Sequence, residues 1–336
     1  MFLILYSPFA ARLGLLDRPG ARKIHAGHIP LIGGVSIYCT LLVLLPAFTT
    51  LDSSLLWYLC ASGLLVLFGV LDDRKSISIK VRVLVEIIAG LMMVYGAGLW
   101  VFDLGNLLGF REFYMPLWLS LPFTIIAVFG ITNAWNMIDG MDGLAGILTL
   151  ISLGSYYFLT YGSGSNSVLP SLMLGATAAF LLFNVSNNRL IPKVFLGDAG
   201  SKLIGFTLVW LLIDCTQGGS LTRQHLPATL ALFIVAVPLI DMVATTIRRG
   251  RKGLPPFAPD RTHVHYILER AGLNQQEILF MVGSAAIVVN LSGILLYHLG
   301  AADWILFALF WGFTLFHFAT IEHAWKLSRW LHRKIG

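Results

Sequence analysis

Residues 117–159 read LWLSLPFTIIAVFGITNAWNMIDGMDGLAGILTLISLGSYYFL, two apolar runs separated by a short polar stretch. The flanking runs, 117–131 and 147–159, contain no charged residue. The stretch between them, 132–146, holds two asparagines, two aspartates and three glycines. Because a helix needs about 20 mostly apolar residues to cross a bilayer, this pattern predicts two membrane helices joined by a polar connection.

The rest of the chain has the same character. Of its 336 residues, 57% are hydrophobic and 12% are charged, whereas soluble domains carry about 25% charged residues. The sequence therefore predicts an all-α fold, a polytopic membrane helix bundle of about 10–11 transmembrane helices in a single domain over residues 1–336. Spans are expected at 31–50, 54–71, 83–102, 115–132, 144–161, 168–184, 202–214, 227–246, 278–298 and 303–321, with 1–11 as the stub of a further span.

Lysine and arginine fall almost entirely in one set of connections between these spans. Of the 23 such residues, all but Arg111 and Arg223 lie in that set or in the basic tail over 322–336. The positive-inside rule places this set in the cytoplasm. Topology and an anionic inner leaflet thus account for the net charge of +6, so the lipid bilayer is expected as a partner and nucleic acid is not.

Two adjacent carboxylates, Asp72 and Asp73, follow directly on an apolar span. Acids at a membrane boundary are usually functional. The alternative is a solvated loop neutralised by the two basic residues that come next. Lys80 is a candidate contact for an anion, and Glu86 is expected to be a structural partner of Lys80 or Arg82.

The polar stretch quoted above carries Asp139 and Asp142 three residues apart, with Asn136 three residues before Asp139. The interspersed glycines favour a loop or a loosened helix start. Carboxylate and amide oxygens are hard ligands that suit Mg²⁺, which keeps several waters and uses one or two protein groups together with substrate phosphates. Capping of the next helix by Asp142 is the alternative, but capping explains only one of these residues.

A third polar cluster lies in VFLGDAGSK, residues 194–202, where Asp198 opens the next apolar helix. Asp198 is either the N-cap of that helix or a metal ligand that faces phosphate. The adjacent glycines allow close approach of the backbone, and helix N-termini favour anions. Asn184, at the end of the preceding span, is a further polar candidate.

The longest cytoplasmic connection, 248–276, contains three prolines that forbid a continuous helix. It ends in PDRTHVH, in which Arg261, His263 and His265 form a cationic, hydrogen-bonding segment suited to phosphate or a carbonyl group. The two histidines lie two residues apart, which is not the i, i+4 spacing of a zinc-binding helix. The alternative is a basic loop that contacts lipid.

These clusters all lie on the cytoplasmic side and combine carboxylates with cations. Such a set predicts one metal-dependent site for phosphate chemistry, in which a metal ion neutralises phosphate oxygens and orients an in-line displacement. The substrates would be a nucleotide or other pyrophosphate from the cytosol and a second molecule from the bilayer. An ion-coupled membrane transporter is the alternative of another class, but it predicts acids in the middle of spans, whereas the main acids here lie at span ends.

Four motifs, DDRKSISIK, NAWNMIDGMDGLAG, VFLGDAGS and PDRTHVH, occur in this order. In this the chain resembles the polyprenyl-phosphate N-acetylhexosamine-1-phosphate transferases over nearly its whole length, and especially the branch that uses UDP-GlcNAc and undecaprenyl phosphate. The resemblance implies a helix bundle with its active cleft on the cytoplasmic face of the bacterial inner membrane. It also implies an enzyme that uses Mg²⁺, or Mn²⁺, to form undecaprenyl-pyrophosphoryl-GlcNAc and UMP, the first membrane step of a polysaccharide of the O-antigen or enterobacterial common antigen type.

The resemblance also implies roles for individual residues. The implied catalytic residues are Asp72, Asp73, Asp139 and His263. Substrate binding is implied for Lys80, Asp142, Asn184, Arg261 and His265, with Asp142 near the nucleotide base. Metal binding is implied for Asp198, Asn136 and Asp139.

The chain departs from the family pattern at two positions. Tyr266 stands where the family's histidine loop has a further histidine, so that position is not needed as an imidazole. Ser76 stands where some relatives have a third acid after the Asp pair, which excludes a three-acid metal site there. The sequence leaves open whether another UDP-N-acetylhexosamine replaces UDP-GlcNAc and whether the protein is a homodimer.

Overall fold

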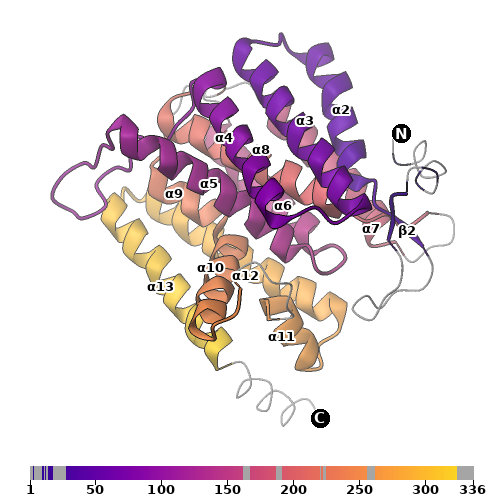
Figure 1. Ribbon diagram of the computed structural model, residues 1–336. Coiled ribbons are helices and arrows are strands. Elements are labelled where there is room, and N and C mark those ends of the chain that lie inside the picture. The colour runs from indigo at the N-terminus through magenta and orange to yellow at the C-terminus, as the bar shows by residue number, and fades with distance from the viewer. Residues whose placement is uncertain are drawn as a thin grey trace.

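The computed structural model describes residues 3, 10, 12, 14–17, 28–161, 167–186, 191–219, 221, 225–255 and 262–323. These form a helix bundle with one two-stranded ribbon (Figure 1). In chain order the elements are β1 (Leu16–Asp17), β2 (Ile29–Pro30), α2 (Gly33–Phe48), α3 (Ser53–Arg74), α4 (Ile79–Leu91), the π-helix η1 (Met92–Gly96), α5 (Leu117–Ile138), α6 (Leu144–Thr160), α7 (Val168–Asn184), α8 (Gly197–Gln217), α9 (Ala228–Ile234), α10 (Ala236–Arg251), α11 (Val264–Arg270), α12 (Gln275–His298) and α13 (Asp303–Glu322).

The prediction of an all-α membrane bundle is confirmed. Five helices are long and apolar enough to cross a bilayer, α3, α5, α8, α12 and α13, or six if α9 and α10 count as one span. The apolar helices α2, α6 and α7 are shorter, with 16 or 17 residues each. Large apolar side chains such as Phe280, Trp118 and Phe316 are exposed on the bundle surface, as expected where helices face lipid.

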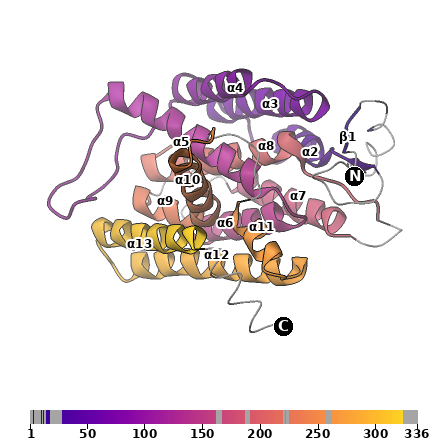
Figure 2. The same cartoon turned by 60° about the horizontal axis from the view of Figure 1, so that its bottom comes forward.

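Helix α8 is the centre of the bundle. Every residue from Ala199 to Gln217 is buried, and Figure 2 shows α8 between a layer that contains α3 and α4 and a layer that contains α12 and α13. Its neighbours approach closely through glycine: a Cβ added at Gly34 of α2 would lie 2.1 Å from the backbone nitrogen of Gly200. A Cβ added at Gly69 of α3 would lie 2.4 Å from the Cα of Ala199. These contacts fix the first turn of α8.

Several expected boundaries differ from the structure. The span expected at 115–132 continues to Ile138, so Asn133 and Asn136 lie on helix α5 and not in a polar connection. The prediction of one continuous span over 227–246 is wrong, because α9 and α10 meet at a bend of 84°. The span expected at 83–102 begins earlier, at Ile79, and its helix ends at Gly96. Helix α8 begins at Gly197 rather than near 202, so Lys202 is buried inside the bundle and does not belong to a cytoplasmic loop.

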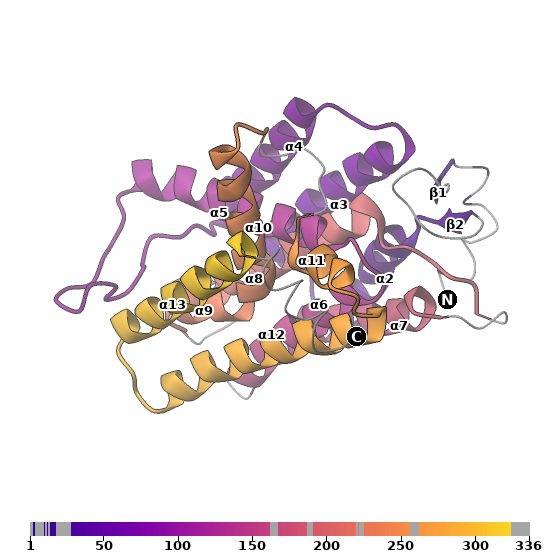
Figure 3. The ribbon, with the colours of Figure 1, turned by 90° about the horizontal axis from the view of Figure 1, so that it is seen from below.

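Two of the described connections lie at opposite ends of the bundle. Figure 3 shows the long connection over 97–116 projecting at one end and the β1–β2 ribbon at the other. The ribbon pairs antiparallel, Leu16 opposite Pro30, and an isolated parallel bridge joins Leu31 to Phe195 just before α8. The ribbon therefore lies at the end where α8 begins, beside the polar clusters.

Candidate active site

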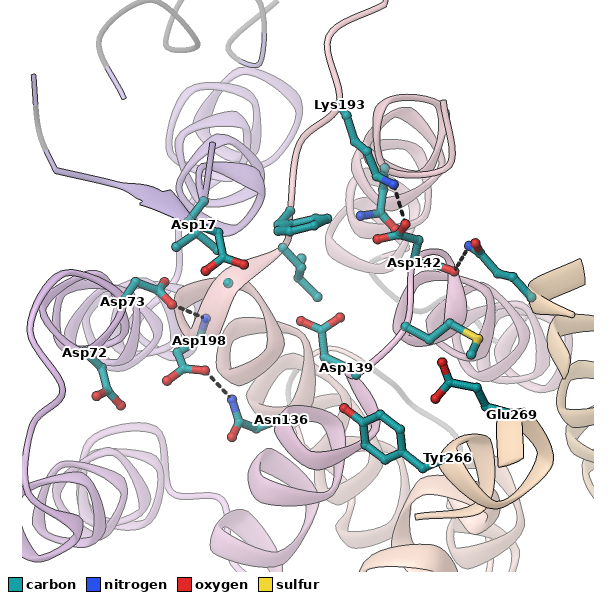
Figure 4. A pocket seen from close by; sticks show the side chains of 18 of the residues that line it. Asp17, Asp72, Asp73, Asn136, Asp139, Asp142, Lys193, Asp198, Tyr266 and Glu269 are labelled. Carbon is teal, nitrogen blue, oxygen red and sulfur yellow. Dashed lines mark hydrogen bonds and ion pairs between the residues drawn. The ribbon is translucent and has the colours of Figure 1, made fainter. Parts of the chain in front are cut away.

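A cavity of about 760 Å³ opens at this end of the bundle (Figure 4). Within the described part of the chain, its wall contains seven carboxylic acids, Asp17, Asp72, Asp73, Asp139, Asp142, Asp198 and Glu269. The same wall has two basic side chains, Arg82 and Lys193. The structure thus brings together the three acidic clusters that the sequence places at the ends of separate spans.

Asp73 reaches across from α3 to the N-terminus of α8. Its Oδ1 accepts a hydrogen bond from the backbone N–H of Asp198 at 2.9 Å, and its Oδ2 accepts one from Ala199 at 3.4 Å. Leu196, the residue before α8, does not cap the helix with its side chain. A carboxylate at this position satisfies free amide groups and interacts favourably with the helix dipole, so Asp73 is the capping group of α8.

Asp198 lies in the first turn of α8 and faces α5. Its Oδ1 accepts a hydrogen bond from Asn136 Nδ2 at 2.8 Å, and the same amide group donates to Ser201 Oγ at 3.0 Å. Figure 4 shows Asp198, Asn136 and Asp73 gathered on one side of the cavity. Asp198 is therefore not the N-cap of its own helix, and its carboxylate lines the cavity.

Asp139 follows the last residue of α5 and lies between these residues and the opposite wall. Burial and the nearby carboxylates of Asp198, Asp73 and Asp142, in that order, raise the pKa of Asp139 to about 8. Carboxylates that share one site repel each other unless a cation is present. The surroundings of Asp139 are therefore those of a site built to receive positive charge.

Asp142 lies on the opposite wall and forms an ion pair with Lys193, which precedes α8. The N-cap of α6 is Gly143, with a φ of +83°, so the capping role considered for Asp142 does not occur. Asn184 also lines the cavity and holds this wall in place: its Oδ1 accepts from the N–H of Gly143 at 2.6 Å and its Nδ2 donates to the carbonyl of Val194 at 3.0 Å. The structure thus gives Asn184 two backbone partners.

Asp72 turns away from Asp73 toward α4. Arg82 donates from Nη2 to Asp72 Oδ1 at 2.7 Å and places Nε 2.6 Å from Oδ2. The N–H of Ile77 also donates to Oδ1, at 3.0 Å. The Asp72 side chain is 1% exposed, so this carboxylate is held in a charge-assisted network at the edge of the cavity.

The two histidines of PDRTHVH lie behind the cavity wall and not on it. His263 places Nδ1 2.7 Å from Oδ2 of Asp241 on α10, whose Oδ1 lies 3.2 Å from Nε2 of His317 on α13. Burial lowers the pKa of His265 to about 4, so its ring is neutral at pH 7. A Cβ added at Gly140, on the cavity wall, would lie 2.4 Å from His265 Nε2.

Besides His265, two of the predicted substrate contacts are absent from the described lining of the cavity. Lys80 is exposed in the first turn of α4 and does not line the cavity. Arg261 lies outside the described residues. Their assignment as anion contacts stays a prediction.

Several lining residues were not predicted from the sequence. In the sequence, Lys193 is only one of many basic residues at span ends, and Asp17, Glu269 and Gln275 belong to no recognisable motif. Tyr266, noted only as a departure from the family loop, lines the cavity and lies on the same side as Asp139 (Figure 4). The signal available for Lys193 was its position four residues before the glycine of VFLGDAGS.

The oxygen donors of the cavity suit a hard divalent cation. Asp139 and Asp198 present carboxylates to it, and Asn136 brings an amide. Among the residues described, no three His, Cys, Asp or Glu side chains form a ready coordination sphere. Mg²⁺ accepts such a site because it retains waters and takes its other ligands from substrate phosphates, so the residues present fit this ion.

Comparison with known proteins places the chain among glycosyl transferases. The sequence profile of glycosyl transferase family 4 matches residues 55–216. The chain is 37% identical to the undecaprenyl-phosphate alpha-N-acetylglucosaminyl 1-phosphate transferase of Yersinia pestis over 339 residues, which cover 99% of this chain and 91% of the relative. It is 36% identical to the protein of that name in Escherichia coli strain K12, covering 99% and 90%, and 38% identical to that of Haemophilus influenzae, covering 98% and 93%. The chain belongs to glycosyl transferase family 4.

Proposed function

We propose that this protein transfers GlcNAc-1-phosphate from UDP-GlcNAc to undecaprenyl phosphate. The observation that carries the proposal is the identity of 36–38% over 98–99% of the chain to relatives whose names state an undecaprenyl-phosphate acceptor and an N-acetylglucosaminyl 1-phosphate group. A cavity lined with carboxylates at the end of a membrane bundle supports it, because carboxylates can hold a Mg²⁺ ion that binds substrate phosphates and because one substrate is a lipid.

The reaction exchanges one phosphorus–oxygen bond for another. An oxygen of undecaprenyl phosphate forms a bond to the β-phosphorus of UDP-GlcNAc. The bond from that phosphorus to the oxygen bridging the two phosphates breaks, and UMP leaves with the bridging oxygen. The products are undecaprenyl-pyrophosphoryl-GlcNAc and UMP, and no oxidant or further reactant is required.

The residues that would hold Mg²⁺, or Mn²⁺, are Asp198, Asn136 and Asp139. When bound, the ion neutralises charge on phosphate oxygens and orients the displacement. Asn136 orients Asp198 through its 2.8 Å hydrogen bond. Asp73 holds the first turn of α8 in place by accepting from its amide groups.

The two basic side chains of the described lining lie at different parts of the cavity, and both are paired with aspartate. Lys193 lies beside Asp142, at the wall assigned to the nucleotide. Arg82 lies beside Asp72, at the edge assigned to the lipid phosphate. We assign Lys193 an electrostatic contact to the nucleotide phosphates. Other proposed roles rest on the family resemblance: activation of the lipid phosphate by Asp72, and binding or catalysis by Lys80, Arg261, His263 and His265.

The bacterial inner membrane is the proposed location, with the cavity, the 248–276 loop and the C-terminal tail in the cytoplasm. The distribution of lysine and arginine in the sequence supports this orientation: all but Arg111 and Arg223 belong to one set of predicted connections or to the tail. Two residues of that set, Arg82 and Lys193, line the cavity. The proposed product is the first lipid-linked intermediate of an O-antigen or enterobacterial common antigen type of polysaccharide.

Release of UMP tests the function. Purified protein is incubated with undecaprenyl phosphate, Mg²⁺ and a panel of UDP-sugars, and UMP is measured for each. We expect UMP with UDP-GlcNAc, and removal of Mg²⁺ by a chelator should stop its release. Faster release from UDP-GalNAc would assign the other sugar, and absence of UMP with every UDP-N-acetylhexosamine would reject the transferase.

A further inference from the structure

An ion pair is buried directly behind the cavity, at residues that do not line it. Lys202 on α8 places its Nζ 3.1 Å from Oε1 of Glu86 on α4, and the two side chains are 6% and 1% exposed. The second oxygen of Glu86, Oε2, accepts a hydrogen bond at 2.7 Å from Nδ2 of Asn133 on α5. Three helices thus meet at one carboxylate. The partner predicted for Glu86, Lys80 or Arg82, is replaced by a residue 116 positions away in the chain.

Stability alone does not account for this pair. Desolvation of two charges opposes their attraction, and a buried ion pair is often no more stabilising than apolar residues of the same size. Removal of one partner is costly, because it leaves an uncompensated charge in the interior. The pair therefore penalises any arrangement of α4, α5 and α8 that separates its members, which is a constraint on geometry.

Lys202 and its neighbour Asn133 each lie about one helical turn from a residue of the site. Lys202 follows Asp198 by four residues on α8, and Asn133 precedes Asn136 by three residues on α5. Residues at these spacings lie on the same face of a helix. The rotation of α8 and α5 that joins Asn133 and Lys202 to Glu86 is thus the rotation that joins Asn136 to Asp198 in the cavity.

The backbones of α5 and α8 are already in close contact at this level. A Cβ added at Gly205 would lie 2.7 Å from the Cα of Thr132. Close packing sets the distance between the two helices but constrains their rotation less, because small surfaces slide past each other. The directional contacts to Glu86 supply the rotational constraint.

We propose that Glu86 and Lys202 are positioning residues of this enzyme. Their buried ion pair, together with the hydrogen bond from Asn133 to Glu86, sets the rotation of α8 and α5 that brings Asp198 to Asn136. This inference rests on the proposed transferase function for its readout. It assigns the pair no contact with substrate and therefore predicts an effect on turnover without a matching effect on substrate affinity.

A double-mutant cycle tests the proposal. Glu86→Gln, Lys202→Met and the double variant are purified, and kcat, KM for UDP-GlcNAc and thermal unfolding are measured. Each single variant should lose at least about tenfold in kcat, because a displacement of about 1 Å in a site has large effects on rate, while KM changes less than about threefold. The double variant leaves no unpaired charge at this position but also lacks the ion pair, so its unfolding temperature should recover while its kcat stays as low as that of the single variants.

Two further variants make the outcome decisive. Asp214→Asn changes an equally buried acid at the far end of α8, whose Oδ1 accepts from the N–H of Leu221 at 3.1 Å, and it should lower the unfolding temperature without changing kcat. Lys202→Arg keeps the charge and should stay active. Where a single variant does not fold, the folded double variant and Lys202→Arg decide: the double variant should be slow, and Lys202→Arg should turn over at close to the wild-type rate.

Single variants that unfold earlier but keep the wild-type kcat would make the pair merely structural and overturn the proposal. A folded double variant that turns over at close to the wild-type rate would overturn it as well. A wild-type protein that releases no UMP contradicts the transferase function itself, whereas an active wild type with unimpaired single variants contradicts only the positioning role.

Discussion

The carboxylate of Asp73 on α3 accepts a hydrogen bond from the backbone N–H of Asp198 on α8, 2.9 Å away. The contact thus joins the side chain of Asp73 to the backbone of Asp198. This leaves the Asp198 carboxylate directed to the cavity, where Asn136 donates to it. One aspartate fixes the helix end that presents the other.

Substitution of Asp73 should separate these two effects. Asp73→Ala removes both acceptors of the α8 N-terminus and should lower the free energy of unfolding by about 1–2 kcal/mol, the usual cost of a lost cap. Asp73→Asn keeps one acceptor oxygen and should lose less stability. Thermal unfolding in detergent measures the difference, and equal unfolding temperatures for both variants would contradict the capping role.

Asp198→Asn should abolish transfer while the protein stays folded. The amide keeps the size of the side chain but loses its charge, so we expect at least about a hundredfold loss of kcat, or about 2.7 kcal/mol of transition-state stabilisation. UMP release measures the rate. Asp303→Asn, which alters an acid at the opposite end of the bundle, is the control and should remain active; near-normal turnover by Asp198→Asn would reject its role as a metal ligand.

Lys193→Met should weaken the binding of UDP-GlcNAc. The substitution removes one of the two basic side chains in the described lining and leaves Asp142 without its ion-pair partner. We expect KM for UDP-GlcNAc to rise about tenfold, equivalent to about 1.4 kcal/mol, with a smaller change in kcat. Steady-state kinetics with each substrate varied in turn checks this, and a rise in KM for undecaprenyl phosphate alone would place Lys193 at the lipid end.

Binding of Mg²⁺ should depend on pH through Asp139. With a pKa of about 8 in the metal-free protein, this carboxyl is mostly protonated at pH 7, so binding of a cation must release its proton. Affinity should therefore rise with pH until about 8 and then level off. In the metal-free protein the sign for stability is opposite: the contribution of this group is full below the unfolded pKa and is lost as pH rises to about 8.

Calorimetric titration of Mg²⁺ in buffers of different ionisation enthalpy measures the released proton. Asp139→Asn cannot release one at this position, and its affinity for Mg²⁺ should be lower and nearly constant with pH. Proton release of wild-type size in Asp139→Asn would assign the titration to another acid.

Gly140→Ala should disturb the histidine segment. The added methyl group would lie 2.4 Å from Nε2 of His265 and 2.9 Å from the hydroxyl of Tyr266, so these rings must move. We expect a loss of about tenfold in kcat, consistent with a displacement near 1 Å at a site. Gly154→Ala in α6 is the matched control: nothing lies within 4 Å of its added Cβ, and alanine there should stabilise the helix by about 0.5–1 kcal/mol.

Convergence of the acids could be predicted from the sequence, because Asp72, Asp139 and Asp198 all occur at span ends on the same side of the membrane. The sequence also contains a signal for the bend between α9 and α10. Pro238 lies in the first turn of α10, where a residue without an N–H is tolerated, and it interrupts the apolar run that was predicted to be continuous.

Other features have no local signal. Lys202 lies at an apparent span boundary, and only the start of α8 five residues earlier shows that it is buried. Its pairing with Glu86 joins residues on separate helices, and neither periodicity nor spacing reports such contacts. Asp17 and Glu269 are single acids in unremarkable surroundings, and the fold alone brings them to the cavity.

The complete burial of α8 has a consequence for how the protein is made. Of the five candidate spans, α8 has the lowest mean hydropathy, 1.3, and it alone is fully enclosed by protein. Such a segment is a weak substrate for insertion from the ribosome by itself. The helices that enclose its first turn, α2 and α3, and Glu86 on α4 all leave the ribosome before it. The order of synthesis therefore means that the helices that enclose the start of α8 are made before α8 itself, and that Glu86 is already present when Lys202 is synthesised.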